Sequence, residues 1–465
     1  MTDPVLAPAG LADTDNDVFA GESDRNGVLD IETEGGSVTV TGQLTDNITL
    51  TSITAFEEVE KLHEEDTDSS ALDFVNATFG FDYDQFTQEI RLNIESGENN
   101  YTIGAFYYEN DSEGFQDLDI NGLPLSPGLV LDQNSQYTQD LESFAIFGQA
   151  DWVLNDTWGL SVGLRYTDED KDFTYNNEFE VIDVFGNVSP PGTVLDQQIV
   201  ADDIEDSLDT SELTGNVTLD WNVSDATNAY ASIRRGIKAA GFNTGLGAGT
   251  QFDEEELTSY ELGLKSNIGA ATRLSAALFY YDYEDFQALT FNSTIGAGEI
   301  VNAPQTNVIG GEIELVSQIT DNLLLSVGVA YSDNEIEEIT DAQGVTLEDR
   351  QLVLAPELEA NWILRYNHDI GSNGSLSYQI DGNYKSDHFF DVSNVDVSRQ
   401  GGYTVHNARI GWVSPNENLE VSLWAKNLFE KEYLVYTFDF TGLAGFNQQF
   451  FGQPRWIGAS AKYSW

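Results

Sequence analysis

The sequence has no cysteine and a single methionine among its 465 residues. Without cysteine, a disulfide framework, a thiol nucleophile and a thiolate metal site are all excluded. No apolar run approaches the roughly 20 residues that a membrane-spanning helix needs. The first residues, MTDPVLAPAGLADTDND, have neither a basic region nor an apolar stretch, so we expect no signal peptide there. If this chain crosses a membrane, it must do so with strands.

Basic residues are also scarce, because 19 Lys and Arg stand against 80 Asp and Glu, which gives a formal net charge of -61. A field of this sign repels phosphate backbones and excludes a nucleic-acid partner. The acidic residues concentrate in four segments that we expect to be loops, namely 64–73, 201–212, 252–256 and 332–341. This pattern is typical of a solvated exterior adapted to salty water, and weak collection of cations by these loops is the alternative.

Residues for catalysis or for a metal are missing as well. The sequence has no His-Glu-x-x-His spacing, no Gly-rich phosphate loop and no Gly-x-Ser-x-Gly turn. One sheet would allow His368 and His406 to face each other, but an interfacial or lumen position is favoured over a metal ligand for each. The other two histidines are His63 and His388. We therefore expect no enzymatic activity, no cofactor and no metal site.

The segment DTDND (13–17) copies the first half of a calcium loop. However, Val18 stands where such a loop requires Gly, and Asp24 replaces the bidentate Glu. We therefore expect no ordered calcium site at this position.

Aromatic residues and strict alternation are what the sequence does contain. It has 26 Phe, 20 Tyr and 8 Trp. In the ending GQPRWIGASAKYSW, apolar residues from Ile457 to Trp465 alternate with Gly, Ser and Lys. The same period of two recurs at 217–223 and 376–384, and a helical period is nowhere sustained. A final strand that is apolar on one face and ends on an aromatic residue is typical of an outer-membrane β-barrel.

The connections between these alternating segments are short and long in turn. Long connections are expected at 57–83, 110–140, 168–211, 236–256, 284–306, 333–357, 385–402 and 429–452. Short polar turns are expected near residues 46, 97, 155, 225, 269, 321, 372 and 417. This asymmetry is typical of outer-membrane barrels, which have tight periplasmic turns and long outer loops.

Eight short turns and the C-terminal strand predict about seventeen strands. The first strand is expected near Ser37–Gly42 and runs inward. We therefore expect residues 1–35 to be an irregular extracellular segment or truncated loop, and residues 36–465 to form a transmembrane antiparallel β-barrel. Bacterial single-chain barrels have an even number of strands, so this odd count and the missing signal peptide suggest part of a longer protein.

Several segments, in the right order, resemble the barrel of TonB-dependent outer-membrane receptors, and most of all the iron-siderophore branch. They include ATNAYASIRRGIKAAGFNTG (226–245), EELTSYELGLKSN (255–267) and LSAALFYYDYEDFQAL (274–289), together with NAPQTNVIGGEIELVSQITDNLLLSVGVAYSDNEI (302–336) and the C-terminal WAKNLFEKEY…GQPRWIGASAKYSW. DNITLTSITAFEE (46–58) resembles an earlier strand. The resemblance covers nearly all of the chain from about residue 36.

The resemblance implies a 22-stranded barrel filled by an N-terminal plug and preceded by a TonB box. This chain departs from that pattern, because SVTVTG (37–42) is followed by a turn and a barrel-like strand, so half of a hairpin is favoured over a TonB box. We therefore expect the plug domain to be absent from this chain. Polar residues that face inward would then need water or a plug as partners. They are Arg165, Asp220, Lys265, Glu312, Glu314, Arg365, Arg409 and Lys426.

One basic cluster stands out in this acidic chain. Arg234, Arg235 and Lys238 are weak candidates for binding an anionic ferric chelate, and salt bridges to neighbouring acidic loops are the favoured alternative. No other ligand-binding residue can be named from the sequence.

By resemblance, the expected function is transport of a ferric siderophore or similar scarce nutrient across the bacterial outer membrane. Its partners would be outer-membrane lipid, the nutrient, and a TonB-type energising complex that acts through a plug not present in this chain. The alternatives are a plug-less passive pore or a partner of a separate plug chain. A soluble β-rich adhesive or carbohydrate-binding domain is disfavoured, because the strands offer no second apolar layer.

Overall fold

The structure of the chain is a computed structural model that describes residues 17–21, 23–123, 126–183, 201–244, 250–292, 297–341, 343–440 and 446–465. These residues are nearly all in strands. Their helical elements are two short 3-10 turns, Gly371–Asn373 and Asp396–Ser398. Within the described ranges, no helix has both the length and the apolar character that crossing a bilayer would take.

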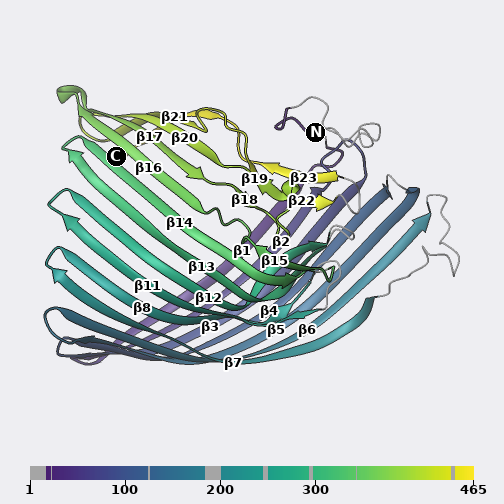
Figure 1. The fold of residues 1–465 in the computed structure, drawn as a ribbon, viewed down its shortest axis with the longest axis horizontal. Coiled ribbons are helices and arrows are strands. Elements are labelled where there is room, and N and C mark those ends of the chain that lie inside the picture. Colours follow the sequence, from purple (N-terminus) through teal and green to yellow (C-terminus); the bar gives the residue numbers. More distant parts are fainter. Residues whose placement is uncertain are drawn as a thin grey trace.

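The strands form one curved antiparallel wall, in which each strand pairs with the next along the chain (Figure 1). Seventeen strands make up this wall, as the sequence predicts, and the prediction of an all-β barrel fold is confirmed. They are β1 (Val28–Thr45), β2 (Ile48–Asp66), β3 (Val75–Ser96), β4 (Asn99–Leu123), β5 (Ser126–Val153), β6 (Trp158–Asp183), β7 (Ala201–Ser224), β8 (Thr227–Lys238), β11 (Glu255–Ile268), β12 (Thr272–Asn292), β13 (Ala297–Thr320), β14 (Leu323–Thr340), β16 (Leu358–Asp369), β17 (Ser375–Lys385), β20 (Tyr403–Val413), β21 (Leu419–Lys426) and β24 (Trp456–Tyr463).

Short turns join the strands at one end of the wall, which we call the turn end, and longer connections lie at the opposite loop end. All eight short turns fall where the sequence predicts them, from the turn between β1 and β2 to the turn between β20 and β21. In Figure 1 the turns and the C-terminus lie on the left, and the longer connections lie on the right. SVTVTG is half of the β1–β2 hairpin, as expected, since Val38 pairs with Thr54.

The long connections are shorter than predicted, because the strands continue far into the segments expected to be loops. β2 and β3 pair as far as Asp66 and Asn76, within the predicted loop 57–83. β4 and β5 likewise pair as far as Leu123 and Ser126, within the predicted loop 110–140. The acidic segments 201–212 and 332–341 therefore lie mostly in strands, and the expectation of loops there is wrong.

The physical reason for this extension is that the period of two persists with a different chemistry on each face. On β6, Asp168, Asp170 and Asp172 point to one face, whereas Phe173 and Tyr175 point to the other and are buried. Water solvates the carboxylates while the rings stack against one another, so neither face requires lipid. The first strand also begins earlier than expected, at Val28, within the segment 1–35.

Small hairpins and loop segments cover the loop end. They are β9 (Gly241–Phe242) with β10 (Gln251–Phe252), β18 (His388–Phe389) with β19 (Arg399–Gln400), and β22 (Leu434–Phe440) with β23 (Phe446–Phe451). A further strand, β15 (Thr346–Arg350), pairs with the far part of β14. Val392, which follows β18, packs with Ala288, Ala303, Ile336 and Ile339 into a small buried core. The loop end is thus a packed structure.

Candidate ligand-binding site

One face of the wall carries an exposed apolar band between two rows of aromatic residues. The band includes Leu164, Leu262 and Leu278, whose exposed fractions are 58%, 60% and 65%. The row toward the loop end contains Phe56, Phe86, Tyr107, Phe144, Tyr166, Tyr260, Tyr280 and Tyr331, and the row toward the turn end contains Tyr101, Trp152, Trp158, Trp221, Tyr366, Tyr378, Trp412 and Tyr463. On β6, Trp158 belongs to the row near the turn end and Tyr166 to the row near the loop end. The stretch of strand from one to the other matches the roughly 9–11 residues of a tilted transmembrane strand. This face therefore suits contact with lipid.

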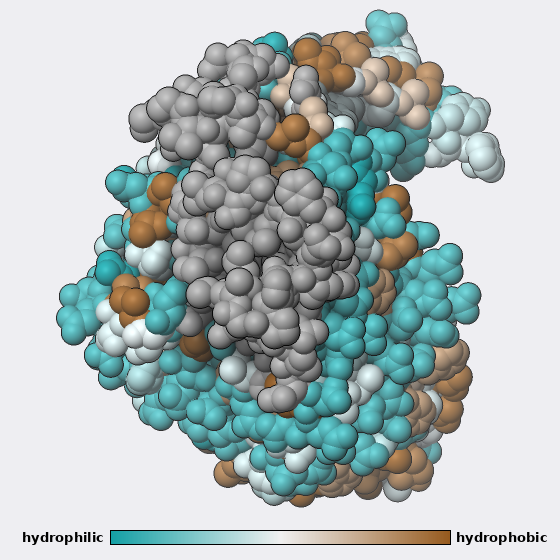
Figure 2. All heavy atoms as spheres, turned by 90° about the vertical axis from the view of Figure 1, so that its right-hand side faces the viewer, coloured by the Kyte–Doolittle hydropathy of each residue, from teal (hydrophilic) through white to brown (hydrophobic). Residues whose placement is uncertain are grey.

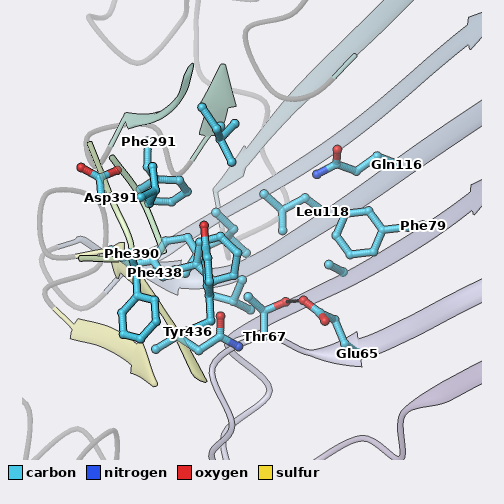
Figure 3. A pocket seen from close by; sticks show the side chains of 18 of the residues that line it. Glu65, Thr67, Phe79, Gln116, Leu118, Phe291, Phe390, Asp391, Tyr436 and Phe438 are labelled. Carbon is cyan, nitrogen blue, oxygen red and sulfur yellow. Dashed lines mark hydrogen bonds between the residues drawn. The ribbon is translucent and has the colours of Figure 1, made fainter. Parts of the chain in front are cut away.

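A cavity of about 450 Å³ lies at the loop end, beyond this band. Its lining comes from segments far apart in the sequence. One side is formed by the outer ends of β2, β3 and β4, and the other by β12, the segment after β18, and β22 (Figure 3). The aromatic residues of the lining are Phe79, Phe291, Phe390, Tyr436, Phe438 and Phe440. Its volume falls in the range of roughly 300–1,000 Å³ that is usual for ligand pockets.

The rings on the β22 side hold one another in place. The Phe438 ring lies 5.5 Å from that of Phe291 and 4.8 Å from that of Tyr436, and the Phe390 ring lies 5.7 Å from that of Tyr436, all measured between centroids. Leu118 and Phe79 face this group from the opposite side of the cavity in Figure 3. The cavity is thus an aromatic pocket with walls that its own packing supports.

Two carboxylates are the charged groups of the lining. Glu65 accepts a hydrogen bond of 3.1 Å from the Thr67 hydroxyl, drawn dashed in Figure 3. Asp391 accepts a bond of 2.8 Å from the Ser393 amide. Burial raises the pKa of the Tyr436 hydroxyl, and the charge of Asp391 raises it further. The electrostatic potential of the pocket is therefore negative.

A second cavity of about 290 Å³ adjoins the first and shares Phe291, Phe390, Asp391, Tyr436 and Phe438 with it. Asp341 and Asp439 add two more carboxylates to this second lining. Asp391 and the shared rings thus stand between two connected spaces, both at the loop end.

A family model described as "TonB dependent receptor-like, beta-barrel" matches residues 3–428. The chain belongs to the family of TonB-dependent receptors. This confirms the resemblance and the expected location in the bacterial outer membrane. For a receptor barrel the loop end faces the outside of the cell, so the aromatic pocket opens outside the membrane.

Solved receptors share the fold of this receptor barrel. The ferric yersiniabactin uptake receptor FyuA from Yersinia pestis is 18% identical, with a TM-score of 0.74, and the match covers 94% of this chain and 61% of that one. The siderophore receptor PiuA from Acinetobacter baumannii is 17% identical, with a TM-score of 0.70, and covers 95% and 65%. The ferric-catecholate import receptor Fiu from E. coli K12 is 17% identical, with a TM-score of 0.68, and covers 99% and 68%. The chain thus spans less than two thirds of the first two receptors. The family and fold are those of transport receptors.

The inward polar residues of the receptor wall lie on the face predicted from the alternation, opposite the apolar band. Many of them find partners within the wall itself. The Arg165 guanidinium lies 5.4 Å from the Phe106 ring centroid, and the Lys265 ammonium lies 5.5 Å from that of Tyr230. Arg365 donates two hydrogen bonds to the Gln379 side chain. The expectation that these cations depend on water or a plug is therefore too strong, because rings and amides of the wall also stabilise them.

The basic cluster does not converge on one point in this receptor. Arg235 is ion-paired with Glu256 at 2.6 Å and with Glu212 at 3.1 Å. Arg234, next to it on β8, points to the opposite face, where its charge reaches Tyr230 and Tyr281. Lys238 ends β8. The salt-bridge alternative thus describes Arg235, and the role of the three residues in ligand binding stays a prediction.

Arg235 also lies within a cluster of carboxylates. Oxygens of Glu212, Glu254 and Glu256 lie within 4.8 Å of one another. Burial and the charges of Glu212 and Glu256 raise the pKa of Glu254. Because Arg235 already supplies the positive charge at this point, the cluster is an ion-pair network.

Beyond the apolar band, the outer face carries rows of acidic residues in direct cross-strand register. One row runs Glu58, Asp84, Asp111, Asp140 and Asp172 over β2 to β6. A second row runs Glu109, Glu142, Asp170 and Asp209 over β4 to β7. We call these two sets the acidic rows. Figure 2, which faces the loop end, shows a mostly hydrophilic surface, with hydrophobic residues mainly near its margins, including the upper one.

The histidines do not form a pair. His368 lies on β16, whereas His406 lies on β20, and β17 separates the two strands. The expectation that one sheet allows them to face each other is wrong, since their neighbours across the strands are Leu376 and Gly382. His368 stacks on Tyr366 in the turn-side aromatic row. Of the segment 13–17, where we expect no ordered calcium site, only Asp17 lies within the described residues.

The sequence pattern does not predict the aromatic pocket. Its main contributors, Glu65, Phe390, Asp391, Tyr436 and Phe438, fall in segments predicted to be loops. A signal is nevertheless present, because LVYTFDF followed by FNQQFF is unusually aromatic for an outer loop. Aromatic residues at that density indicate a packed surface.

Proposed function

We propose that this chain is the barrel part of a TonB-dependent receptor that transports a ferric siderophore or a similar scarce nutrient across the outer membrane. The observation that supports this most is the aromatic pocket at the loop end, where a receptor meets its ligand before transport. Its size and its ring lining suit an organic ligand of low molecular weight. Bulk water, inorganic ions and macromolecules would gain little from such a lining.

On this proposal, the pocket captures the ligand and the space inside the wall conducts it. The energy would come from a TonB-type complex that acts through a plug, which we expect to lie outside this chain. The inward rings and cations, such as Arg165 over Phe106, would line the route. Binding and energised passage are thus assigned to different parts of the receptor.

Uptake of radioactive iron by living cells tests this function. Cells that produce the native receptor should accumulate an iron chelate, cells that lack it should not, and a protonophore should abolish the uptake. Tyr436→Ala should raise the half-saturating chelate concentration on the order of tenfold, because it removes a ring from the pocket wall. Phe429→Ala is the matched control, since Phe429 is 67% exposed and does not line the pocket.

Uptake that continues after the proton gradient is dissipated would contradict this function and favour a passive pore. The same conclusion would follow from a constant ion conductance of the purified native protein in planar bilayers. Equal effects of Tyr436→Ala and Phe429→Ala would instead place the capture of ligand elsewhere.

A further inference from the structure

The two cavities at the loop end contain acidic residues and no basic residue in their linings. Glu65 and Asp391 line the larger cavity, and Asp341, Asp391 and Asp439 line the smaller one. Every Lys and Arg of the sequence falls within the described part of the chain, so the undescribed segments cannot add one. Both linings therefore carry negatively charged side chains and no positively charged ones.

The rings add to this negative potential. An aromatic ring is electronegative over its face, so a cation is attracted there and an anion is not. Phe291, Phe390, Tyr436 and Phe438 line both cavities, together with Asp391. A buried anion next to these groups would lose its hydration without a compensating partner.

The net charge of -61 extends this preference beyond the pocket. The acidic rows lie on the same side of the membrane, so a ligand approaches the loop end through a negative field. Such a field raises the local concentration of cations and lowers that of anions. Pocket and surface therefore select for the same sign of charge.

We propose that the ligand of this pocket is a ferric chelate of net positive charge, namely a hydroxamate-type chelate that carries a protonated amine. This inference rests on the proposed function and names its substrate class. Singly charged hydroxamate groups neutralise iron(III), so an added ammonium makes the complex a cation. Doubly charged catecholate groups leave the same ion strongly anionic. The ammonium would lie among the rings beside one of the two carboxylates, Glu65 or Asp391, which stand on opposite sides of the cavity in Figure 3, and the apolar linkers would lie against Leu118 and Ile120.

Binding to the purified native receptor in detergent tests the inference, with three chelates followed by isothermal titration calorimetry. The first is a ferric trihydroxamate with a free amine, the second is the same chelate with its amine acetylated, and the third is a ferric tricatecholate. We expect the first to bind on the order of tenfold more tightly than the second, because of its ammonium. The third should bind more weakly than both.

Removing the carboxylates of the pocket should remove this preference. In Glu65→Gln/Asp391→Asn, the amine chelate and its acetylated form should bind with similar affinity, and the affinity for the acetylated form should stay near that of the wild type. Glu64→Gln is the matched control, because the alternation of β2 places Glu64 on the opposite face from Glu65. The acetylated chelate also reports on folding, since its binding requires an intact pocket.

The possible outcomes test the inference about ligand charge separately from the proposed transport function. If none of the three chelates binds, the inference fails, and the uptake experiment with the protonophore decides separately whether the proposed function fails as well. Tighter binding of the tricatecholate would overturn the inference alone and leave ferric-chelate transport standing. A charge preference that persists unchanged in the double variant would also overturn it, because the preference would then come from another place.

Discussion

Arg235 illustrates how a rare cation is used in this acidic protein. Its guanidinium joins Glu212 on β7 to Glu256 on β11, across the place where the pairing of β7 with β8 ends at Gly215. The ion pairs thus connect β8 to both of its neighbouring strands at the point where its backbone pairing with β7 ends. The residue that looks like an anion-binding group in the sequence acts as a connection between strands.

We therefore expect Arg235→Ala to destabilise the receptor without weakening chelate binding. Loss of a partly exposed ion pair costs roughly 0.2–1 kcal/mol, and the remaining carboxylates then repel one another. Urea unfolding in detergent micelles, followed by circular dichroism, measures the change. The double variant Arg235→Ala/Glu256→Gln should recover part of the loss. Weaker binding of a ferric chelate by Arg235→Ala would show instead that the basic cluster takes part in recognition.

At the scale of strands, glycines paired with aromatic rings recur around the wall. In seven cross-strand pairs the ring lies over the glycine so closely that an added Cβ atom would overlap it. These pairs are Gly80–Phe115, Gly104–Phe147, Gly114–Tyr137, Gly263–Tyr230, Gly310–Phe279, Gly382–Trp362 and Gly458–Trp424. Each pair holds one register, because a slip by one residue would move the ring to the other face.

Gly104→Ala should accordingly destabilise the wall by about 1–3 kcal/mol, since its methyl group would overlap the Phe147 ring. Gly148→Ala is the control on the neighbouring strand, because its Cβ would meet only the Thr102 carbonyl oxygen, at an ordinary 3.6 Å. Heat-induced unfolding monitored by gel mobility compares the two. Equal losses for both variants would contradict a role for the ring, and recovery in Gly104→Ala/Phe147→Ala would support it.

Across the whole molecule, the acidic rows place like charges directly opposite each other on strands about 5 Å apart. In the second row, a hydrogen bond that the protonated Asp170 carboxyl donates to Asp209, together with the charge of Asp209, raises the pKa of Asp170. A carboxyl whose pKa is raised on folding stabilises the folded state below its ordinary value of 3.8 and loses this contribution as the pH rises. The part of the outer wall around Asp170 should therefore be less stable at neutral pH than near that value.

We expect the melting temperature of the purified receptor to rise as the pH falls from 7 toward that ordinary value. Asp387, whose pKa is lowered by its bond to Arg399, loses its stabilising effect only below 3.8. Melting curves by circular dichroism in one detergent follow the effect. Asp170→Asn should reduce the rise, whereas Asp156→Asn, in a turn at the other end, should not. A melting temperature that falls steadily over this range would contradict the prediction.

The sequence predicts those features of the molecule that depend on a pattern within a few neighbouring residues. The strand count, the eight turns and the inward side of Arg165 and Lys265 follow from a period of two, which can be observed within a few residues. The strand ends were misjudged because acidic alternation, as in Asp168 to Asp172, resembles a polar loop once the apolar band ends. The pocket could not be predicted, since it joins Glu65 to Phe438 through contacts that no local pattern specifies.

The acidic rows also set two salt effects against each other. Dissolved ions screen electrostatic interactions, and the Debye length falls from about 10 Å at 0.1 M to about 3 Å at 1 M ionic strength. Concentrated salt should thus weaken the repulsion between Asp84, Asp111 and Asp140 and stabilise the part of the wall beyond the apolar band. The same ions would slow the arrival of a cationic ligand, because its attraction from a distance is screened. The association rate of the ligand should therefore be highest at low ionic strength, whereas the folded receptor should be most stable in concentrated salt.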